Sequence, residues 1–179
     1  MRSISQIYEE NGIKHSQRSI ESTAVDEVIQ KNYTNQVLLK DEFGKPFLLP
    51  QTVEINYSHT QQLLLWGEHQ TLRIGVDIET VRPQLIKIKH KFCREDELMY
   101  IPLEHEIQYL LAIWSSKEAI YKAFGKKEVD FREHMQILPF TLGEMGSFQA
   151  NFLIGTPTRF TVHYRWNGAQ FMCWTLLSI

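Results

Sequence analysis

The chain has 179 residues, of which 43% are hydrophobic and 12% aromatic, and its formal net charge is −2 at pH 7. This composition supports a folded core and excludes a disordered chain, while the small net charge excludes a global basic field for nucleic acid or anionic membranes. We expect a reduced, cytoplasmic protein, because there are only two cysteines, no signal-like N-terminal apolar segment, and no run near the roughly 20 residues of a membrane span.

The predicted elements begin with a helix over residues 17–33, where apolar residues recur at helical spacing. Short strands follow at 37–40 and 46–49, on either side of a turn. Residues 62–66 and 71–79 are typical of the two strands of a hairpin. These segments place several strands after one amphipathic helix.

The second half of the chain begins with loop and short helix at 86–100, followed by the longest helical pattern at 105–125, which ends at Gly125. The tail favours a β-hairpin, because two strand-like segments flank Asn167-Gly168. Two long helices among several strands predict an α+β fold.

Two acids stand inside one predicted strand, in the stretch GVDIE at residues 75–79. Side chains alternate along a strand, so Asp77 and Glu79 share one face while the apolar side chains point the other way. The apolar face consists of Ile74, Val76 and Ile78. The Cα atoms of the two acids lie about 6–7 Å apart, so their charges repel unless a cation lies between them or water screens them.

The stretch WSSKEAIYK at residues 114–122 holds the few polar residues of the long predicted helix. Most of this helix is apolar, which indicates a buried central position, and an unpaired buried glutamate would be costly. One interpretation is a surface ion pair between Glu118 and Lys122, worth about 0.3 kcal/mol. The other places Glu118 beside Asp77 and Glu79 as a third oxygen ligand of a metal.

Three carboxylates without a nearby histidine or thiolate favour Mg²⁺ or Mn²⁺ over zinc. Magnesium keeps positions for water and phosphate, so this interpretation predicts a substrate with a diphosphate. The sequence lacks G-x-x-x-x-G-K-[ST], a strand-linked G-x-G-x-x-G and G-x-S-x-G. Their absence argues against P-loop NTPases, dinucleotide-binding domains and the nucleophile elbow of hydrolases.

Two upstream stretches complete the pattern, GKP at residues 44–46 and NYSHT at 56–60. Taken alone, the first is typical of a turn with a surface lysine and the second of a strand end with a solvated histidine. In their joint order, GKP, NYSHT, GVDIE, FCREDEL and WSSKEAIYK resemble the 4′-phosphopantetheinyl transferase superfamily, in particular its single-chain, surfactin-type branch. The resemblance covers residues 40–125, about half of the chain.

The resemblance implies two similar α+β halves related by a pseudo-twofold, here about residues 1–75 and 76–179, with a ligand cleft between them. It implies transfer of 4′-phosphopantetheine from coenzyme A to a serine of an acyl or peptidyl carrier protein, with Mg²⁺ (or Mn²⁺) and release of adenosine 3′,5′-bisphosphate. No nucleic acid or membrane is expected as a partner, and two fused halves would make a monomer self-sufficient. The alternatives are a non-catalytic module that binds coenzyme A or a carrier protein, and a Mg²⁺-dependent phosphohydrolase.

The resemblance also implies roles for the residues that match its motifs. Asp77, Glu79 and Glu118 would hold the metal. Glu118 would in addition take the serine proton, directly or through water. Lys122 would neutralise phosphate charge and stabilise the leaving group.

Coenzyme A contacts are implied at both upstream motifs and on the helix. Lys45 and its turn with Pro46 would meet the adenine or ribose, while Ser58 and His59 would meet the 3′-phosphate and diphosphate. Lys122 and Lys117 would contact coenzyme A from the helix. The stem of Lys117 would pack among apolar residues while its ammonium reaches the mouth of the cleft.

Family members place basic residues for the 3′-phosphate before GKP, where this chain is short. Arg18, at the start of the first predicted helix, is the main candidate for that contact, followed by Lys14. A basic and apolar segment at 86–94 predicts either a docking patch for an acidic carrier protein or an ordinary solvated loop. Its residues are Ile86, Lys87, Ile88, Lys89, Lys91, Phe92 and Arg94.

Overall fold

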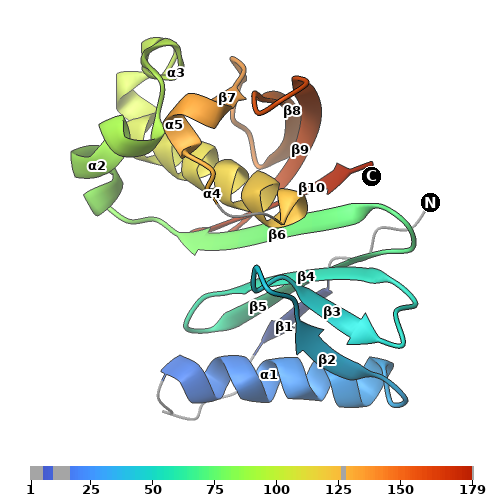
Figure 1. Cartoon of the computed structure of the whole chain (residues 1–179). Helices are drawn as coiled ribbons and strands as arrows, with labels where there is room; N and C mark the ends of the chain where they lie inside the picture. The colour runs from blue at the N-terminus through green and yellow to red at the C-terminus, as the bar shows by residue number, and fades with distance from the viewer. Residues whose placement is uncertain (1–5, 10–16, 126–127, 179) are drawn as a thin grey trace.

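The computed structural model describes residues 6–9, 17–125 and 128–178, with side chains from residue 24 onward within these ranges. Helices and strands are mixed along the chain, so the predicted α+β class is confirmed. Figure 1 shows the first five strands and α1 on one side of the molecule, and the remaining elements on the other. Within the described ranges, every helix is too short or too polar to cross a membrane.

The N-terminal elements are one helix and two small antiparallel sheets. They are α1 (Gln17–Asn32), β1 (Gln6–Glu9), β2 (Val37–Lys40), β3 (Pro46–Leu49), β4 (Glu54–His59) and β5 (Leu63–His69). The three-stranded sheet has the order β1-β5-β4, and β2 pairs with β3. The helix packs on these strands through a core of Val25, Val28, Leu48, Ile55, Leu64 and Trp66. The helix at 17–33 and the strands at 37–40 and 46–49 are thus confirmed.

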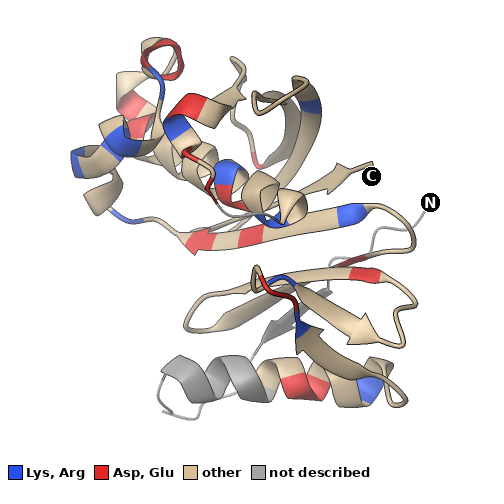
Figure 2. Ribbon diagram, viewed as in Figure 1, with Lys and Arg blue, Asp and Glu red and all other residues tan. Residues whose placement is uncertain are grey.

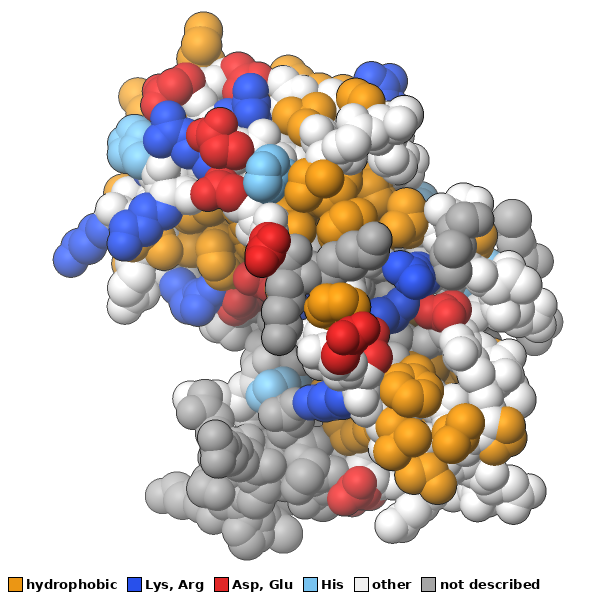
Figure 3. Space-filling view, viewed as in Figure 1, with side chains coloured by type: hydrophobic (Ala, Val, Ile, Leu, Met, Phe, Trp, Pro, Cys, Tyr) orange, Lys and Arg blue, Asp and Glu red, His pale blue; other side chains and the backbone are white. Residues whose placement is uncertain are grey.

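The outward face of the β2–β3 hairpin is apolar. Val37 and Leu49, which pair across the hairpin, are 60% and 55% exposed. Leu39 is also exposed on β2, and hydrophobic side chains gather over this part of the surface in Figure 3. The inward residue Leu48 is fully buried, which fixes the orientation of the hairpin.

The C-terminal elements form an antiparallel five-stranded sheet with helices on one face. They are β6 (Arg73–Thr80), α2 (Gln84–Phe92), α3 (Glu95–Met99), the 3₁₀ turn η1 (Leu103–His105), α4 (Glu106–Phe124), α5 (Phe131–His134), β7 (Met135–Ile137), β8 (Met145–Phe152), β9 (Thr158–Asn167) and β10 (Gln170–Leu177). The strand order is β6-β10-β9-β8-β7, and Figure 1 shows α4 lying across the sheet. The predicted helix at 105–125 and the hairpin around Asn167-Gly168 are confirmed.

The hairpin predicted at 62–66 and 71–79 is wrong, because β5 and β6 belong to different sheets. The edge of β6 pairs with β10, while its apolar face packs on β5. This contact between the sheets consists of Leu63, Leu65, Ile74, Val76, Ile78 and Met172.

The predicted alternation of β6 is confirmed, since Asp77 lies on the opposite face, toward α4. The expected boundary at residues 75 and 76 falls inside β6; that division and the pseudo-twofold stay predictions.

Close packing between β6 and α4 depends on Gly75. A Cβ atom at this position would lie 1.9 Å from the carbonyl oxygen of Ala119 and 2.6 Å from the amide nitrogen of Ala123. Helix α4 ends at Gly125, whose left-handed φ of 69° favours glycine. The sequence thus brings the helix backbone directly onto the strand that carries the two acids.

Candidate functional site

A pocket of about 440 Å³ lies where β3 and β4 face β6 and α4. Among the predicted site residues whose side chains the structure describes, all except Lys117 line it. They are Lys45, Pro46, Ser58, His59, Asp77, Glu79, Glu118 and Lys122. Figure 2 shows acidic positions on β6 and both acidic and basic positions on the adjacent α4. The fold therefore brings four motifs from separate parts of the chain to one pocket.

Asp77 lies at the base of this pocket and is only 3% exposed. Its Oδ1 accepts a hydrogen bond from Ser58 Oγ at 2.8 Å and an ion-paired hydrogen bond from Lys122 Nζ at 2.7 Å. Its Oδ2 accepts from Ser115 Oγ at 2.6 Å. These donors come from β4 and α4, so the aspartate links the N-terminal sheet to the long helix.

Sequence reasoning missed the role of Ser115. A signal was present, because Ser115 precedes Glu118 by three residues and Lys122 by seven, and therefore shares their helix face. The residue is fully buried in the structure. Its hydroxyl is held next to Asp77 by the close approach of α4 to β6.

Lys122 pairs with Asp77 rather than with Glu118. Its Nζ donates to Asp77 Oδ1 and, at 3.2 Å, to the carbonyl oxygen of Val76. Among the residues that the structure describes, Glu118 makes no hydrogen bond or ion pair. Burial and the charge of Asp77 raise the pKa of Glu118 to about 7, although Lys122 partly opposes this shift. The interpretation of Glu118 and Lys122 as a surface ion pair is therefore wrong.

Glu79 lies at the outer end of the acid pair on β6. Its Oε1 accepts from the Arg82 guanidinium at 2.8 Å and from Trp114 Nε1 at 3.2 Å. Burial and the nearby Asp77 raise the pKa of Glu79, while Arg82 and Trp114 lower it. The net shift of this pKa is upward, because burial and Asp77 together outweigh Arg82, Trp114 and Lys122.

The three acids have the chemistry of a site for a hard divalent cation. They offer only oxygen donors, and the pKa of Glu79 and that of Glu118 are both raised by Asp77. A cation among them would offset this repulsion. Within the described ranges, however, no three carboxylate, imidazole or thiol side chains are close enough to hold an ion. The ligand set Asp77, Glu79 and Glu118 therefore stays a prediction.

The GKP turn brings Lys45 to the opposite wall of the pocket. Asp41 Oδ1 accepts from the amide nitrogens of Phe43 and Lys45, which holds the turn. The Lys45 ammonium forms an ion pair with Glu54 at 2.9 Å, and both side chains are mostly buried. Lys45 is thus oriented before any ligand binds.

Lys117 does not reach the mouth of the cleft, and that prediction is wrong. Its side chain is fully buried and its ammonium forms an ion pair with Glu97 at 2.7 Å. The ammonium also donates to the carbonyl oxygens of Phe92, Phe131 and Met135. Burial lowers the pKa of Lys117, and Glu97 acts against that shift. Lys117 directly precedes Glu118 in the sequence, but its side chain points into the core, where α2, α3, α5 and β7 supply the acceptors.

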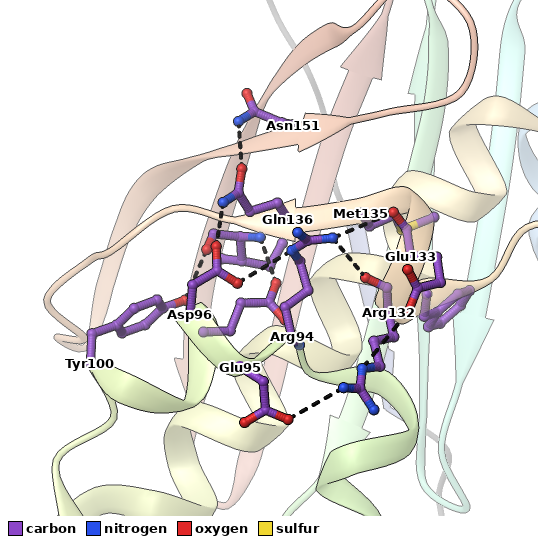
Figure 4. Close-up of polar contacts among 12 residues, drawn as sticks. Arg94, Glu95, Asp96, Tyr100, Arg132, Glu133, Met135, Gln136 and Asn151 are labelled. Atoms are coloured by element: carbon purple, nitrogen blue, oxygen red, sulfur yellow. Dashed lines mark hydrogen bonds and ion pairs between the residues drawn. The ribbon is translucent and has the colours of Figure 1, made fainter.

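The FCREDEL segment supports this buried pair. Glu97 Oε1 accepts from the amide nitrogen of Ile137, and its Oε2 accepts from that of Arg94. Figure 4 shows the adjoining chain of polar contacts from Arg94 through Asp96 and Gln136 to Asn151. The segment therefore joins α3 to β7 and β8.

The basic segment at 86–94 is mostly helix α2 rather than a loop. Lys87 and Lys91 are exposed and Ile86 is 41% exposed. Phe92 is buried and does not belong to the surface, and Lys89 pairs with Glu106 at 2.6 Å. A smaller surface patch therefore remains than the sequence predicted.

Arg18 lies in α1, but its side chain is outside the described residues, as is the whole of Lys14. Both stay predictions as contacts of the 3′-phosphate.

Comparison with known proteins adds an independent observation. A sequence model of the 4′-phosphopantetheinyl transferase superfamily matches residues 73–173, more than half of the chain. The 4′-phosphopantetheinyl transferase HetI of Nostoc sp. is 36% identical over 91 residues, 46% of this chain and 38% of that protein. The 4′-phosphopantetheinyl transferase gsp of Aneurinibacillus migulanus is 29% identical over 102 residues, 53% of this chain and 41% of that protein.

A 4′-phosphopantetheinyl transferase of Bacillus subtilis is 32% identical over 90 residues, 48% of this chain and 39% of that protein. The chain thus aligns with about two fifths of the length of these curated relatives. The family match holds the strand and helix motifs of the pocket, since it begins at β6 and ends in β10.

Proposed function

The chain belongs to the 4′-phosphopantetheinyl transferase superfamily, and we propose that it transfers 4′-phosphopantetheine from coenzyme A to a serine of an acyl or peptidyl carrier protein. One observation carries this proposal. Two acids of β6, the acid and lysine of α4 and two upstream motifs line a single pocket. The pocket lies between the N-terminal strands and the C-terminal sheet, where a nucleotide would contact both.

In the proposed reaction, the serine hydroxyl attacks the phosphorus that bears the pantetheine. A bond forms between serine Oγ and this phosphorus. The phosphorus–oxygen bond to the nucleotide breaks, and its electron pair leaves with adenosine 3′,5′-bisphosphate. The serine proton passes to Glu118, directly or through water. The pKa of Glu118 is about 7 before a cation binds, so a large share of this carboxyl is ionised at neutral pH and able to accept a proton.

Lys122 would stabilise the leaving group. Its ammonium is fixed by Asp77 at 2.7 Å and by the Val76 carbonyl, while about a quarter of the side chain remains exposed to the pocket. A fixed positive charge at this position stabilises the negative charge that develops on the departing phosphate. The fixed position and the partial exposure of the lysine support this proposed role.

The three acids of the pocket would also suit a divalent cation. Asp77, Glu79 and Glu118 would hold Mg²⁺ or Mn²⁺, which would neutralise charge on the diphosphate of coenzyme A. One lone pair of Asp77 Oδ2 remains beside its hydrogen bond to Ser115, so the aspartate keeps capacity for this contact.

Coenzyme A would lie with its nucleotide against the N-terminal wall of the pocket. Lys45 and Pro46 would contact the adenine or ribose, and Ser58 and His59 the phosphates. The carrier protein would approach α2, which carries exposed Lys87 and Lys91 and the partly exposed Ile86. Figure 3 shows basic side chains projecting beside apolar ones over α2, at the left of the view. Such a surface complements an acidic partner.

The proposal is tested by incubating the protein with coenzyme A, Mg²⁺ and apo carrier proteins of the fatty-acid, polyketide and nonribosomal-peptide types. Intact mass spectrometry should show the phosphopantetheine mass added to at least one carrier. Asp77→Ala and Glu118→Ala should each abolish transfer, while Glu104→Ala, at an exposed acid of η1, should not.

Absence of the mass increase on every carrier would contradict the proposal. Coenzyme A binding without transfer would instead support a binding module, and release of phosphopantetheine without a carrier would support a hydrolase. Full activity of both alanine variants would overturn the roles of the acids but not the reaction.

A further inference from the structure

Asn56 begins the NYSHT stretch, yet the proposed reaction gives this residue no role. Its side chain lies on β4 and is only 3% exposed. The Oδ1 atom accepts a hydrogen bond from the amide nitrogen of Val76, on β6, at 3.3 Å. Burial of a carboxamide is costly unless it is hydrogen-bonded, and this contact supplies a partner. A side chain of the N-terminal sheet thus holds the backbone of the strand that carries the two acids.

Gly67 makes room for Val76 beside Asn56. The glycine lies directly opposite Asn56 in the β4–β5 ladder, so both positions face β6. A Cβ atom at Gly67 would lie 2.4 Å from Val76 Cγ1 and 2.9 Å from Ile74 Cδ1. Because glycine has no side chain, the fully buried Val76 occupies this space. We call Asn56 and Gly67 the Val76 socket, and Figure 1 shows β6 lying beside β4.

The socket contacts the residue directly before Asp77. The amide nitrogen of Val76 donates to Asn56, and its carbonyl oxygen accepts from Lys122 Nζ at 3.2 Å. Since β6 lies at the edge of the five-stranded sheet, backbone groups that point away from β10 need partners from outside that sheet. Asn56 and Lys122 are such partners. The backbone before Asp77 is therefore fixed both from the N-terminal sheet and from α4.

Two side chains of β4 bind consecutive residues of β6. Asn56 and Ser58 are two positions apart on β4, so they share a face of the strand. Asn56 holds the Val76 amide, and Ser58 Oγ donates to Asp77 Oδ1 at 2.8 Å. A shift of β6 along β4 would break both hydrogen bonds. Both contacts therefore depend on one register between the two strands.

We propose, on the basis of the proposed function, that Asn56 is a positioning residue of the transfer reaction. Its hydrogen bond and the space at Gly67 fix Val76, and the fixed strand holds Asp77 within reach of its hydrogen-bond donors. A carboxamide suits this task because it accepts the hydrogen bond without adding a negative charge beside the three acids of the pocket. Asn56 acts through the backbone of β6 and not on the substrate.

Two variants disturb the socket in different ways. Asn56→Leu keeps a branched side chain of similar shape but removes the acceptor. Gly67→Ala narrows the space for Val76 from a position outside the pocket lining and keeps the carboxamide, so it tests the socket by itself if Asn56→Leu does not fold. In steady-state transfer to a carrier protein, each variant should lower kcat by about tenfold or more, because Asp77 is displaced. The KM for coenzyme A should stay within about twofold, because the N-terminal wall of the pocket remains.

Tyr164→Phe is the matched control. Tyr164 is also 3% exposed, and its Oη accepts a hydrogen bond from the amide nitrogen of Gly143 at 2.9 Å. The variant therefore removes the same kind of contact, on β9, two strands away from β6 in the sheet. Its kcat and its KM should both stay within about twofold of the wild type.

Urea unfolding provides a readout that needs no activity. If Asn56 holds the register that Ser58 needs, its loss should weaken the Ser58 contact as well. Asn56→Leu combined with Ser58→Ala should therefore lose less stability than the sum of the single variants, with a coupling of about threefold or more in the unfolding equilibrium constant. Asn56→Leu combined with Tyr164→Phe should be additive, because these residues share no partner.

Unchanged kcat in Asn56→Leu and Gly67→Ala would overturn the assignment. A raised KM for coenzyme A with unchanged kcat would also overturn it, because Asn56 would then contact the substrate. An equal fall of kcat in Tyr164→Phe would do the same, because general destabilisation would then be the cause. If the wild-type protein modifies no carrier, the proposed function fails, and additive losses of Asn56→Leu and Ser58→Ala would show separately that Asn56 does not set the position of Asp77.

Discussion

Asp77 on β6, and not the adjacent Glu118 on α4, is the ion-pair partner of Lys122, at a distance of 2.7 Å. This pairing leaves Glu118 half-buried beside two other acids, and its pKa rises to about 7 because of burial and the charge of Asp77. In the proposed reaction this carboxyl would be the base, and it would also be a ligand of the proposed cation. Cation binding and protonation at Glu118 should therefore compete.

The first prediction follows from this competition. With a pKa of about 7, Glu118 is about half protonated at pH 7, about 90% protonated at pH 6 and largely ionised at pH 8.5. Binding of Mg²⁺ should therefore release about half a proton per protein at pH 7, more at pH 6 and almost none at pH 8.5. Calorimetry in two buffers of different ionisation enthalpy measures this release. Glu118→Gln should abolish it, and proton release that is independent of pH would contradict the assignment.

A second prediction concerns stability without metal. A carboxyl whose pKa is raised in the folded state binds its proton more tightly there than in the unfolded chain. Its stabilising effect is fully present below pH 4.5, the ordinary value, and is lost as the pH rises to about 7. The free energy of unfolding of the wild type, minus that of Glu118→Gln, should therefore fall over this window, by at most about 1.4 kcal/mol per pH unit. Urea unfolding at several pH values measures the difference, and a difference that rises with pH would rule out the raised pKa.

The third prediction separates two neighbouring buried serines. Ser115 donates to Asp77 Oδ2, whereas Ser116 donates to the backbone carbonyl of Ala112 at 2.6 Å. A hydrogen bond to a charged acceptor contributes about 1.5–3 kcal/mol. Ser115→Ala should lower both the free energy of unfolding and the rate of transfer, because it removes one of the groups that fix Asp77.

Ser116→Ala is the matched control, since both serines are fully buried on the same helix. It should affect stability but leave the transfer rate within about twofold. Equal activity of the two variants would show that the hydroxyl of Ser115 does not support the site.

Much of the site follows from patterns with a short period. Alternation along β6 placed Asp77 and Glu79 on one face, and the helical period placed Glu118 and Lys122 together. The burial of Lys117 could not be predicted from these patterns. Its four acceptors lie outside α4, on α2, α3, α5 and β7. Periodicity shows only that this lysine points into an apolar arc of the helix. An ion pair with Glu97 in the core and exposure at the mouth of a cleft both agree with that position.

The partner of β6 in the sheet could not be predicted from the sequence pattern either. Residues 62–66 and 71–79 have the composition and spacing of a hairpin, yet β6 pairs with β10, nearly a hundred residues later. The apolar face of β6 packs on β5 instead, through Ile74 and Val76. Local patterns specify which face of a strand is buried, but not which neighbour buries it.

The fourth prediction tests the buried ion pair. Lys117→Met leaves the charge of Glu97 without its partner in a fully buried position. Loss of one partner of a buried pair costs about 3–5 kcal/mol. Urea unfolding should show a loss of that size, whereas Lys87→Met, at an exposed lysine of α2, should change stability by less than about 0.5 kcal/mol.

Combining Lys117→Met with Glu97→Gln should recover part of the loss, because the carboxamide carries no buried charge and its one oxygen still accepts a hydrogen bond from the amide nitrogen of Arg94 or from that of Ile137. A double variant less stable than Lys117→Met alone would show that the unpaired charge is not the cause. Retention of full stability by the single variant would mean that the Lys117 ammonium is not buried against Glu97.

The fifth prediction concerns the contact between strand and helix that assembles the whole pocket. Gly75→Ala would bring a Cβ atom to 1.9 Å from the carbonyl oxygen of Ala119, so the helix backbone must move away from β6. We expect a loss of about 1–3 kcal/mol in the free energy of unfolding. We also expect a fall of more than tenfold in transfer, because Ser115 and Lys122 would no longer reach Asp77. Gly143→Ala is the control, since its Cβ would meet no atom closer than 3.9 Å. A Gly75→Ala protein with wild-type stability and activity would show that α4 does not need this close approach to hold its serine and lysine against the aspartate.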